Sequence, residues 1–328
     1  MKLKNALLAL ATVVAAISPV AANAQDIIFG ISAEAASLQG QTAAEFARRA
    51  NEKLAGKSVV KVFYDSQLGK DKDMLQKVKL GTINITLPSS TMPEIAPEFA
   101  IFDLPFLIKD RDQLAKIDHT LFKNVLVPAA EAQGYEPLAT WENGFRQITN
   151  NKHPVNTPAD LQGLKIRTPN SSWRVAMFKE YGANPTPLAF SELFVALQTG
   201  VVDGQENPLT NIDGAKLNEV QKYLSMTGHV YSPAYPTVGV AAFKKLDPEV
   251  QKVLTETAQE VANWARAQGA EQDDLLLEKL KAAGMKVNVA DHQAFVDASA
   301  PLYAKFAEEV PNGRAMIDQV LSLSKSSN

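Results

Sequence analysis

Hydrophobic and polar positions follow two alternating spacings in the first hundred residues of the chain. Short apolar or β-branched runs, bounded by polar turns, predict strands. Between these runs, apolar residues recur every three or four positions, which predicts helices with one buried face. Strands are expected at 27–32, 59–64 and 83–87, and helices at 41–54 and 71–80. Because strand and helix alternate, the segment predicts a parallel, doubly wound α/β sheet.

The same alternation returns over residues 163–209, as strand, helix, strand, helix and strand. The first of these strands ends at Thr168, because Pro169 stops the strand, and the proline also keeps Thr168 out of the helical region. A serine at 171 or 172 can cap the next helix, and a glycine ends each of the two helices. The last strand runs into a polar turn that contains Asn207. A second α/β unit is therefore expected here.

A long helix is predicted near the C-terminal end of the chain. The start of this helix is marked by three consecutive residues. Asp247 can cap the helix, Pro248 takes the first helical position, and Glu249 places an acid in the first turn. Helical periodicity then continues to about Ala283, which gives roughly 36 residues, or about 54 Å. Gly269 lies inside this helix and should weaken or bend it slightly. No heptad of large apolar residues is sustained, so a single helix lying across both units is favoured over a coiled coil.

Two stretches predict that the chain passes between the units more than once. A strand at 136–141 leads into residues 142–150, which we expect to cross into the second unit, with Gly144 as a hinge that changes its backbone angles. The strand expected at 237–243 returns to the first unit. The resulting assignment is a signal peptide at 1–24, a first domain of residues 25–144 and 233–270, and a second domain of residues 145–232 and 271–328.

The N-terminus has the composition of a secretory signal peptide. Lys2 and Lys4 precede an almost wholly apolar run from 6 to 20, and an A-x-A site predicts cleavage after Ala24. The apolar run is too short for a membrane anchor, and the chain has no cysteine to carry a lipid. Removing the two lysines from 33 basic residues leaves 31 against 36 acidic ones, a net charge of −5. We expect a soluble mature protein in the periplasm, with a monomer as the default.

Composition and motifs argue against several other functions. No block of like charge is present, so no nucleic-acid or membrane-surface partner is expected. The lack of cysteine removes disulfides, thiolate metal sites and cysteine nucleophiles. There is no G-x-S-x-G elbow, P-loop or dinucleotide fingerprint, and we expect neither an enzyme nor a bound cofactor. The histidines show no metal-ligand spacing; they are His119, His153, His229 and His292.

Candidate ligand-binding residues follow from the places where strands end. In an open α/β sheet, ligands bind outside the carboxyl ends of the strands. Arg167 and Asn207 lie at two such ends, and a guanidinium can form two parallel hydrogen bonds to a planar carboxylate. The pattern alone also allows Arg167 as a surface strand residue and Asn207 as a turn former. Asn170, three residues beyond Arg167, completes this candidate set.

Further polar residues mark strand ends in the first unit and in the crossing segment. Ser32, Asp71 and a turn that includes Ser89 lie at such ends. Arg146 is a second candidate for binding a carboxylate, with a salt-bridging arginine near the hinge as the alternative. Residues 101–135, by contrast, contain core positions and no chemistry.

Three sequence stretches resemble the signature of the DctP-type solute-binding proteins of tripartite ATP-independent periplasmic (TRAP) transporters. They are LKIR at 164–167, GANPTPLAFSELFVALQTG at 182–200 and VDGQENP at 202–208. The similarity covers nearly all of the mature chain, including residues 64–69 and 144–150. The resemblance implies a two-domain α/β periplasmic solute-binding fold with a hinge, a central ligand cleft and a long helix spanning both domains. It also implies delivery of a small organic anion to the membrane subunits of a TRAP transporter, without hydrolysis.

The resemblance further implies roles for individual residues. Arg167 would form a bidentate pair with the substrate carboxylate, and Asn207 and Arg146 would add hydrogen bonds. Phe190 matches an aromatic residue that lines the cleft in the family. A periplasmic protein that presents its solute to a receptor instead of a transporter is the alternative of the same class.

The substrate expectation rests on a departure from the sialic-acid-binding branch, which the chain otherwise resembles. That branch has an acidic residue and an arginine in the loop after the third strand, where this chain has Ser89 and Met92. Asp71 matches the branch. The departure favours a smaller acid over sialic acid, either a C4-dicarboxylate or a sugar acid. Hydroxyl contacts from Asp71, Ser89 and Ser90 favour the sugar acid.

Overall fold

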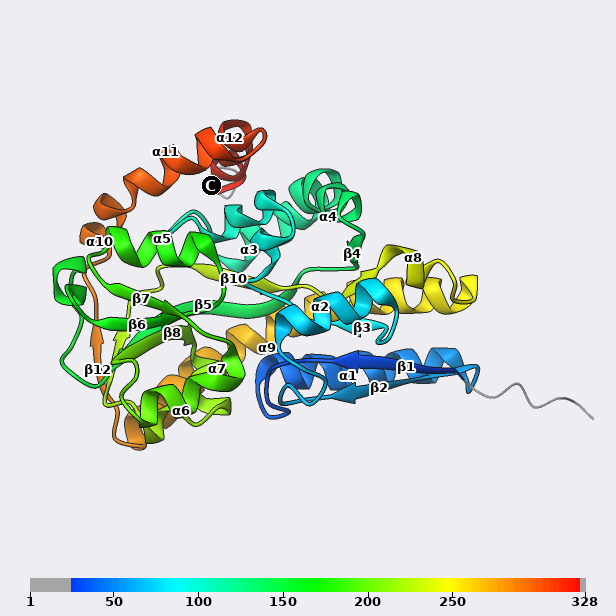
Figure 1. The fold of residues 1–328 in the computed structure, drawn as a ribbon, viewed down its shortest axis with the longest axis horizontal. Helices are drawn as coiled ribbons and strands as arrows, with labels where there is room; N and C mark the ends of the chain where they lie inside the picture. Colours follow the sequence, from blue (N-terminus) through cyan, green and yellow to red (C-terminus); the bar gives the residue numbers. More distant parts are fainter. Residues whose placement is uncertain (1–24, 325–328) are drawn as a thin grey trace, which may run out of the picture.

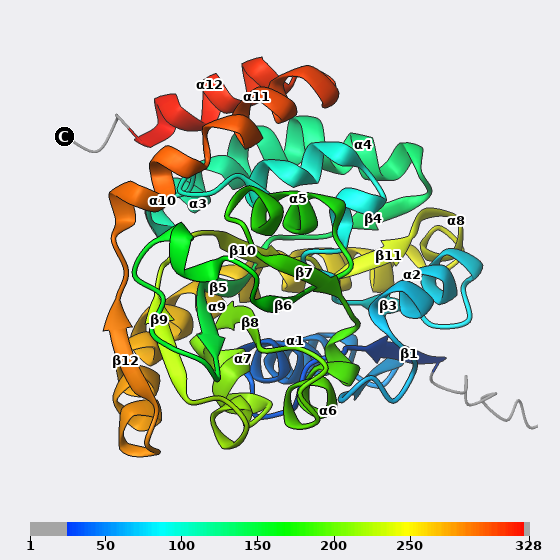
Figure 2. The same ribbon diagram turned by 60° about the vertical axis from the view of Figure 1, so that its left-hand side comes forward.

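The computed structural model describes residues 25–324 (Figure 1). The predicted signal peptide and its cleavage site after Ala24 lie outside the described residues. Two sheets, each covered by helices, form two lobes that lie side by side (Figures 1 and 2). In this part of the chain, no helix is both long and apolar enough to cross a membrane.

The first lobe contains a five-stranded sheet in the order β2-β1-β3-β11-β4. Strands β1, β2 and β3 are parallel, as expected, whereas β11 is antiparallel to both of its neighbours. The strand expected at 237–243 stops at Gly239, where the backbone carbonyl of Val78 leaves no space for a Cβ atom, and a short helix follows. The elements of this lobe are β1 (Gln25–Gly30), α1 (Leu38–Leu54), β2 (Ser58–Phe63), α2 (Asp71–Leu80), β3 (Ile85–Thr86), β4 (Tyr135–Pro137), β11 (Thr237–Gly239) and α8 (Val240–Phe243).

The second lobe contains a seven-stranded sheet in the order β12-β9-β5-β8-β6-β7, with β10 paired to β5. Strands β6, β7 and β8 are parallel, but β5 runs antiparallel to β8 and β9. Both sheets are therefore mixed rather than wholly parallel. The elements are β5 (Trp141–Asn150), β6 (Lys165–Thr168), α5 (Ser172–Glu180), β7 (Asn184–Pro187), α6 (Leu193–Gln198), β8 (Gly204–Pro208), α7 (Leu209–Gly214), β9 (Tyr223–Met226), β10 (Tyr231–Ala234), β12 (Lys286–Val289), α10 (His292–Ala298) and α11 (Ala300–Glu309).

Strand β5 connects the two lobes. Its first residue, Trp141, packs in the core of the first lobe with Phe29 and Phe46, whose ring centroids lie 6.1 and 5.5 Å away. Its last five residues pair with β8 in the second sheet. The separate strand expected at 136–141 is wrong, because β4 ends at Pro137 and β5 begins at Trp141. Gly144 adopts a φ of 121° within β5, a conformation that favours glycine.

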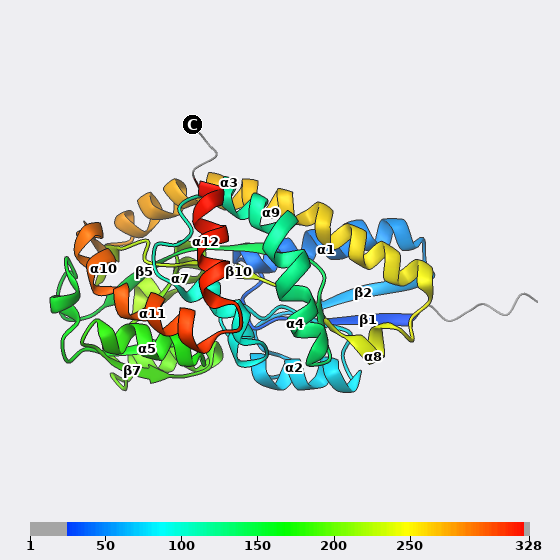
Figure 3. The same ribbon diagram turned by 90° about the horizontal axis from the view of Figure 1, so that it is seen from above.

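A helical layer lies over the junction of the lobes (Figure 3). Helix α3 continues directly into nine residues of π-helix, η3, and then into α4. Helix α12 packs against α3, where Gln113 Nε2 donates a hydrogen bond of 2.9 Å to the Val320 carbonyl. The elements are α3 (Arg111–Ile117), η3 (Asp118–Leu126), α4 (Val127–Ala132) and α12 (Gly313–Ser324), with 3₁₀ segments η1 (Met92–Glu94), η2 (Pro97–Asp103), η4 (Pro158–Leu161), η5 (Phe190–Glu192) and η6 (Leu217–Glu219) elsewhere.

Helix α9 (Pro248–Ala282) confirms the long helix, with 35 residues that lie across both lobes (Figure 3). Asp247 caps it as expected, because its carboxylate accepts a hydrogen bond of 2.8 Å from the Glu249 N–H. Gly269 lies where the helix passes β5. A Cβ atom at this position would come within 2.6 Å of Glu142 Cγ, so the glycine permits a close approach of helix and strand.

We expect Gly269→Ala to destabilise the protein by about 1–3 kcal/mol, although alanine is the better helix former. The buried Glu142 side chain is held by Arg111 and Tyr231 and cannot move aside without breaking those contacts. The measurement is urea unfolding. Ala270→Gly, at the exposed neighbouring position, reports helix propensity alone. A Gly269→Ala protein that is more stable than the parent would show that α9 and Glu142 of β5 are not in close contact at this position.

Candidate functional site

A polar cleft lies where strand ends from the two sheets face each other. Its free volume is about 50 Å³. Six of the seven residues proposed from the sequence line it, and the exposed seventh, Asn170, does not. The lining residues are Ser32, Gln39, Asp71, Leu87, Ser89, Ser90, Thr91, Asn143, Arg146, Arg167, Pro169, Phe190, Asn207 and Asn211.

Arg167 lies on β6 with its guanidinium held in place from one side. Its Nε and Nη2 atoms both donate to the Leu188 carbonyl, at 3.0 and 2.7 Å. The guanidinium lies 5.9 Å from the centroid of the Phe190 ring. Arg167 is only 2% exposed, so it is not a surface strand residue. Its Nη1 donates to no residue within 25–324, which leaves the Nη1–Nη2 edge available for both oxygens of a carboxylate.

The charge of Arg167 survives its burial. Burial lowers the pKa of Arg167 to about 10, while the nearby Glu206 carboxylate acts in the opposite direction. The group is therefore protonated at neutral pH. A buried, immobilised cation at the wall of a cleft has lost most of its water and is ready to pair with an anion.

Arg146 lies in the same cleft but is paired mainly within the protein. Its Nη2 donates to Glu206 Oε1 at 2.9 Å and to Asn207 Oδ1 at 3.0 Å, and its Nε donates to Glu206 Oε2. This geometry matches the alternative given above, a salt-bridging arginine. Asn207 is not in a turn, because it lies inside the buried strand β8, where its Nδ2 donates to Gln205 Oε1 at 2.6 Å. Both residues therefore offer at most part of their hydrogen-bonding capacity to a ligand.

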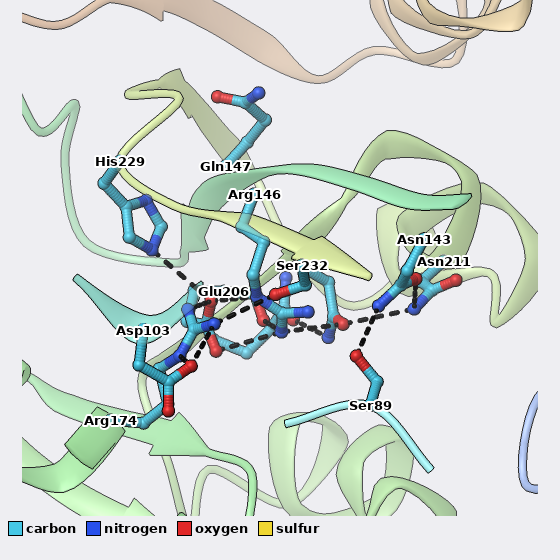
Figure 4. A network of polar contacts seen from close by, with 12 residues as sticks. Ser89, Asp103, Asn143, Arg146, Gln147, Arg174, Glu206, Asn211, His229 and Ser232 are labelled. Atoms are coloured by element: carbon cyan, nitrogen blue, oxygen red, sulfur yellow. Dashed lines mark hydrogen bonds and ion pairs between the residues drawn. The ribbon is translucent and has the colours of Figure 1, made fainter. Parts of the chain in front are cut away.

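A buried charge network supports Arg146 and Asn207 from behind (Figure 4). Arg174 donates to Asp103 Oδ1 at 3.0 Å, Glu206 Oε2 at 3.2 Å and Ser232 Oγ at 2.9 Å. Burial raises the pKa of Glu206, but Arg146 and Arg174 lower it more, so the pKa lies well below its ordinary value. Glu206 is thus an anion between two buried cations.

The sequence analysis missed this network. Asp103 contradicts the expectation that residues 101–135 carry no chemistry, and Glu206 received no role although it stands in the VDGQENP stretch. One signal was available: an acid between Gln205 and Asn207 in a strand of a buried sheet requires a cationic partner. That Arg174 is one of the cationic partners of Glu206 depends on the tertiary fold, because the two residues are 32 positions apart in the chain.

His229 completes the network on its far side (Figure 4). Its Nδ1 lies 2.8 Å from Thr227 Oγ1, and its Nε2 lies 3.3 Å from Glu206 Oε2. The ring is fully buried. Burial lowers the pKa of His229 despite the neighbouring Glu206, so the folded protein holds this imidazole neutral near pH 7.

This burial predicts a pH effect on stability. In the unfolded chain, His229 has an ordinary pKa of about 6.5, which is higher than its pKa in the folded protein. As the pH falls below about 6.5, the unfolded state therefore takes up more protons than the folded state, and the free energy of unfolding decreases. Burial raises the pKa of both Glu34 and Glu142 to about 7, which acts in the opposite direction over the same range. We therefore compare urea unfolding of the parent with His229→Gln near pH 7.5 and near pH 5. The variant should lose less stability on acidification; an equal loss in both proteins would contradict a neutral His229.

The cleft opposite Arg167 presents hydroxyl, amide and carboxylate groups. Asp71, at the first turn of α2, accepts a hydrogen bond of 2.7 Å from Ser32 Oγ. Burial raises the pKa of Asp71, while Ser32 and the charge of Arg167 act to lower it. Ser89 Oγ donates to the Pro233 carbonyl at 2.7 Å and accepts from Asn143 Nδ2 at 3.2 Å. Among the lining residues, Arg146 and Arg167 are the cations and Asp71 is the acid.

One exposed ion pair joins the two lobes near the cleft. Lys70 belongs to the first lobe and precedes Asp71 in the sequence. Glu192 belongs to the second lobe and lies two residues after Phe190. The Lys70 Nζ and Glu192 Oε1 atoms are 2.7 Å apart. Both side chains are substantially exposed, at 50% and 44%. The pair joins the two lobes directly.

Glu192→Lys places two cations side by side across the two lobes and is expected to speed ligand release by roughly two- to fivefold, since exposed pairs contribute little. Stopped-flow displacement of a bound acid measures the rate. The charge-swapped double variant Lys70→Glu with Glu192→Lys should restore the parental rate. Unrestored release in the double variant would assign the effect to something other than this pair.

No group of three or more histidine, cysteine, aspartate or glutamate side chains in residues 25–324 is arranged to hold a metal ion. The site thus consists of the Arg167 guanidinium edge, which can bind an anion, the polar groups of Ser32, Asp71 and Ser89, and the buried charge network around Glu206. Together with the two lobes, these features define a solute-binding protein.

Comparison with known proteins gives the family. A family model described as "Bacterial extracellular solute-binding protein, family 7", DctP, matches residues 29–309. The chain is 37% identical over 309 residues to the 2,3-diketo-L-gulonate-binding periplasmic protein YiaO of Escherichia coli (strain K12), covering 93% of this chain and 94% of that protein. This chain belongs to the DctP family of TRAP solute-binding proteins.

Two solved structures show the same fold. A TRAP periplasmic solute-binding protein from Polaromonas sp. JS666, bound to D-erythronate, matches with a TM-score of 0.86 at 35% identity, over 91% of this chain and 98% of that one. The sugar acid binding protein DctPAm from Advenella mimigardefordensis, in complex with galactonate, matches with a TM-score of 0.88 at 31% identity, over 93% and 99%. The expected two-lobe α/β fold with its long helix is confirmed, as is TRAP-type solute binding.

Proposed function

We propose that this protein captures a short, hydroxylated monocarboxylate, a sugar acid, and delivers it as a monomer to the membrane subunits of a TRAP transporter. The single observation that carries the proposal is the asymmetry of the cleft. The second lobe offers the free Nη1–Nη2 edge of Arg167, and the first lobe offers the Ser32–Asp71 pair. A carboxylate suits the Arg167 edge and sugar hydroxyls suit the Ser32–Asp71 pair.

The same asymmetry argues against a C4-dicarboxylate. A second carboxylate would need a second cation at the other end of the ligand, where the cleft has Asp71 instead. Arg146 cannot serve fully, because Glu206 already holds two of its nitrogens. Placing an anion beside Asp71 would cost free energy through repulsion and desolvation.

Sialic acid fits less well for two reasons. Met92, which stands where the sialic-acid branch has an arginine, is fully buried and does not line the cleft. The narrow free volume favours a thin, short acid over a bulky one. Two similar structures hold the sugar acids D-erythronate and galactonate, and two others hold succinate, so the cleft rather than the relatives decides between these classes.

In this proposal Arg167 binds the carboxylate, Phe190 packs against the guanidinium, and Asp71, Ser32 and Ser89 bind hydroxyls. Arg146 and Asn207 contribute the hydrogen bonds that the network leaves free. The lobes are the two domains assigned from the sequence, and they close about β5 at Gly144 so that water is excluded from the ion pair. The N-terminal segment directs the chain to the periplasm and is cut after Ala24, as the composition of the segment and the periplasmic relatives indicate. No catalytic role is included.

A thermal-shift screen of the mature protein tests the proposal. The panel contains four- to six-carbon aldonates and uronates, succinate and malate, sialic acid, and the matched neutral polyols. A ligand at 1,000 times its Kd stabilises by about 4 kcal/mol, which raises Tm by several degrees. Shifts with aldonates or uronates alone are expected. Shifts with succinate alone, or with neutral polyols, would overturn the assignment.

A further inference from the structure

A second cavity, which shares no residue with the cleft, is lined by α9 and by the continuous helix formed by α3, η3 and α4. Figure 3 shows the course of these helices. Its volume is about 440 Å³, within the range of small-molecule sites. Residues 136–140, from β4 to the start of β5, form its floor. The family relationship and the cleft account for none of these residues.

Arg266 supplies a buried charge to this cavity. It lies on α9, lines the cavity and is 8% exposed. Its Nη2 donates to the Asp118 carboxylate and, at 3.4 Å, to Thr140 Oγ1. Burial lowers the pKa of Arg266 to about 10, so the group stays charged at neutral pH.

The guanidinium of Arg266 has donors to spare. Its Nε is buried without a hydrogen-bond partner, and its Nη1 donates to no residue within 25–324. The Asp118 carboxylate accepts from Arg266 Nη2 and from Thr140 Oγ1, and it receives no hydrogen bond from Nε or Nη1. Buried polar groups are nearly always hydrogen-bonded, and the Nη1 of this cavity-lining arginine is the donor left for a bound acceptor.

Part of the cavity wall is apolar, while Lys123, Gln259 and Asn263 are among the polar residues that also line it. Phe122, Leu138, Ala139 and Ala262 are buried and line it. Phe122 belongs to the π-helical segment η3, and such segments occur often at functional sites. A ligand therefore meets a buried cationic anchor at Arg266, the exposed Lys123 and an apolar surface.

We propose that this cavity is a second binding site, for an amphiphilic monocarboxylate whose acid group pairs with Arg266 and whose apolar body packs on Phe122 and Leu138. One acid group is specified, because Asp118 and Glu136 also line the cavity and would repel a second. The site is independent of sugar-acid capture.

Octanoate is the probe, titrated by calorimetry into the mature protein. We expect saturable binding that Arg167→Ala leaves unchanged, since that variant alters only the cleft. Ala262→Phe fills the cavity and should weaken octanoate binding at least tenfold. The paired change Arg266→Gln with Asp118→Asn, which removes both charges together, should do the same.

Two controls complete the test. Arg314→Gln, at an exposed arginine of α12, should bind octanoate as the parent does. Octanol, which has no carboxylate, should bind at least tenfold more weakly than octanoate. Absence of saturable octanoate binding, full binding by Ala262→Phe, or equal binding of octanol and octanoate would overturn the proposal.

Discussion

Arg167→Ala is expected to weaken binding of a sugar acid by about 2–5 kcal/mol. This corresponds to roughly a 30- to 5,000-fold increase in Kd. The reason is that closure takes the ligand carboxylate out of water, and without the guanidinium it has no charged partner. Arg146 cannot substitute, because Glu206 holds its Nε and Nη2 atoms. Isothermal titration of the mature variant with the best acid from the thermal-shift screen gives the Kd directly.

Two variants control this prediction. Arg167→Lys keeps the charge but loses the fork-like geometry, and we expect an intermediate Kd. Arg314→Ala removes an exposed arginine on α12 and should leave the Kd unchanged. Circular dichroism and urea unfolding establish that each variant is folded. An Arg167→Ala protein that binds the acid as tightly as the parent would remove Arg167 from the site.

Glu206→Gln is expected to have the largest effect on stability, a loss of about 3–5 kcal/mol in the free energy of unfolding. Glutamine has nearly the same shape, so packing is preserved while the charge is lost. Arg146 then has no counter-ion in the network, and Arg174 retains only Asp103. The buried guanidinium groups of Arg146 and Arg174 would then have only the Asp103 carboxylate between them. Urea unfolding of parent and variant at neutral pH measures the difference.

The matched control is Glu192→Gln, which removes a carboxylate from the exposed ion pair with Lys70 and should change the free energy of unfolding little. Asp103→Asn should fall between the two, since Arg174 keeps its contact with Glu206. If Glu206→Gln were as stable as Glu192→Gln, the buried carboxylate would not be holding the two arginines in place.

Local patterns in the sequence predicted those parts of the fold that depend on neighbouring residues. The cap at Asp247 and unbroken periodicity gave the start and length of α9, because both are properties of a single helix. The strand-end rule selected Ser32, Asp71, Ser89 and Arg167, because parallel strands bring their carboxyl ends to one edge of each sheet, and all four line the cleft between the sheets. Turn and cap residues are read from a few adjacent positions, so such predictions succeed without tertiary information.

Features that depend on distant residues were missed. The antiparallel strands β5 and β11 arrive from the other lobe, and no local pattern records their direction. Asn207 reads as a turn residue before proline, yet it lies in a buried strand, where β8 pairs with β5 and Arg146 and Gln205 hydrogen-bond its side chain. Asp103 and Arg174 are 71 positions apart, so their pairing is visible only in the fold. Asn170 shows the opposite error, since adjacency to Arg167 in sequence did not bring it into the cleft.

The central claim is that Arg167 binds the carboxylate and the Ser32–Asp71 wall binds the hydroxyls of one short acid. The most direct measurement is a crystal structure of the mature protein with the acid that gives the largest thermal shift. We predict both carboxylate oxygens within hydrogen-bond distance of Arg167 Nη1 and Nη2, and at least one ligand hydroxyl on Asp71. A carboxylate bound elsewhere, with Arg167 facing only hydroxyls or water, would contradict the account.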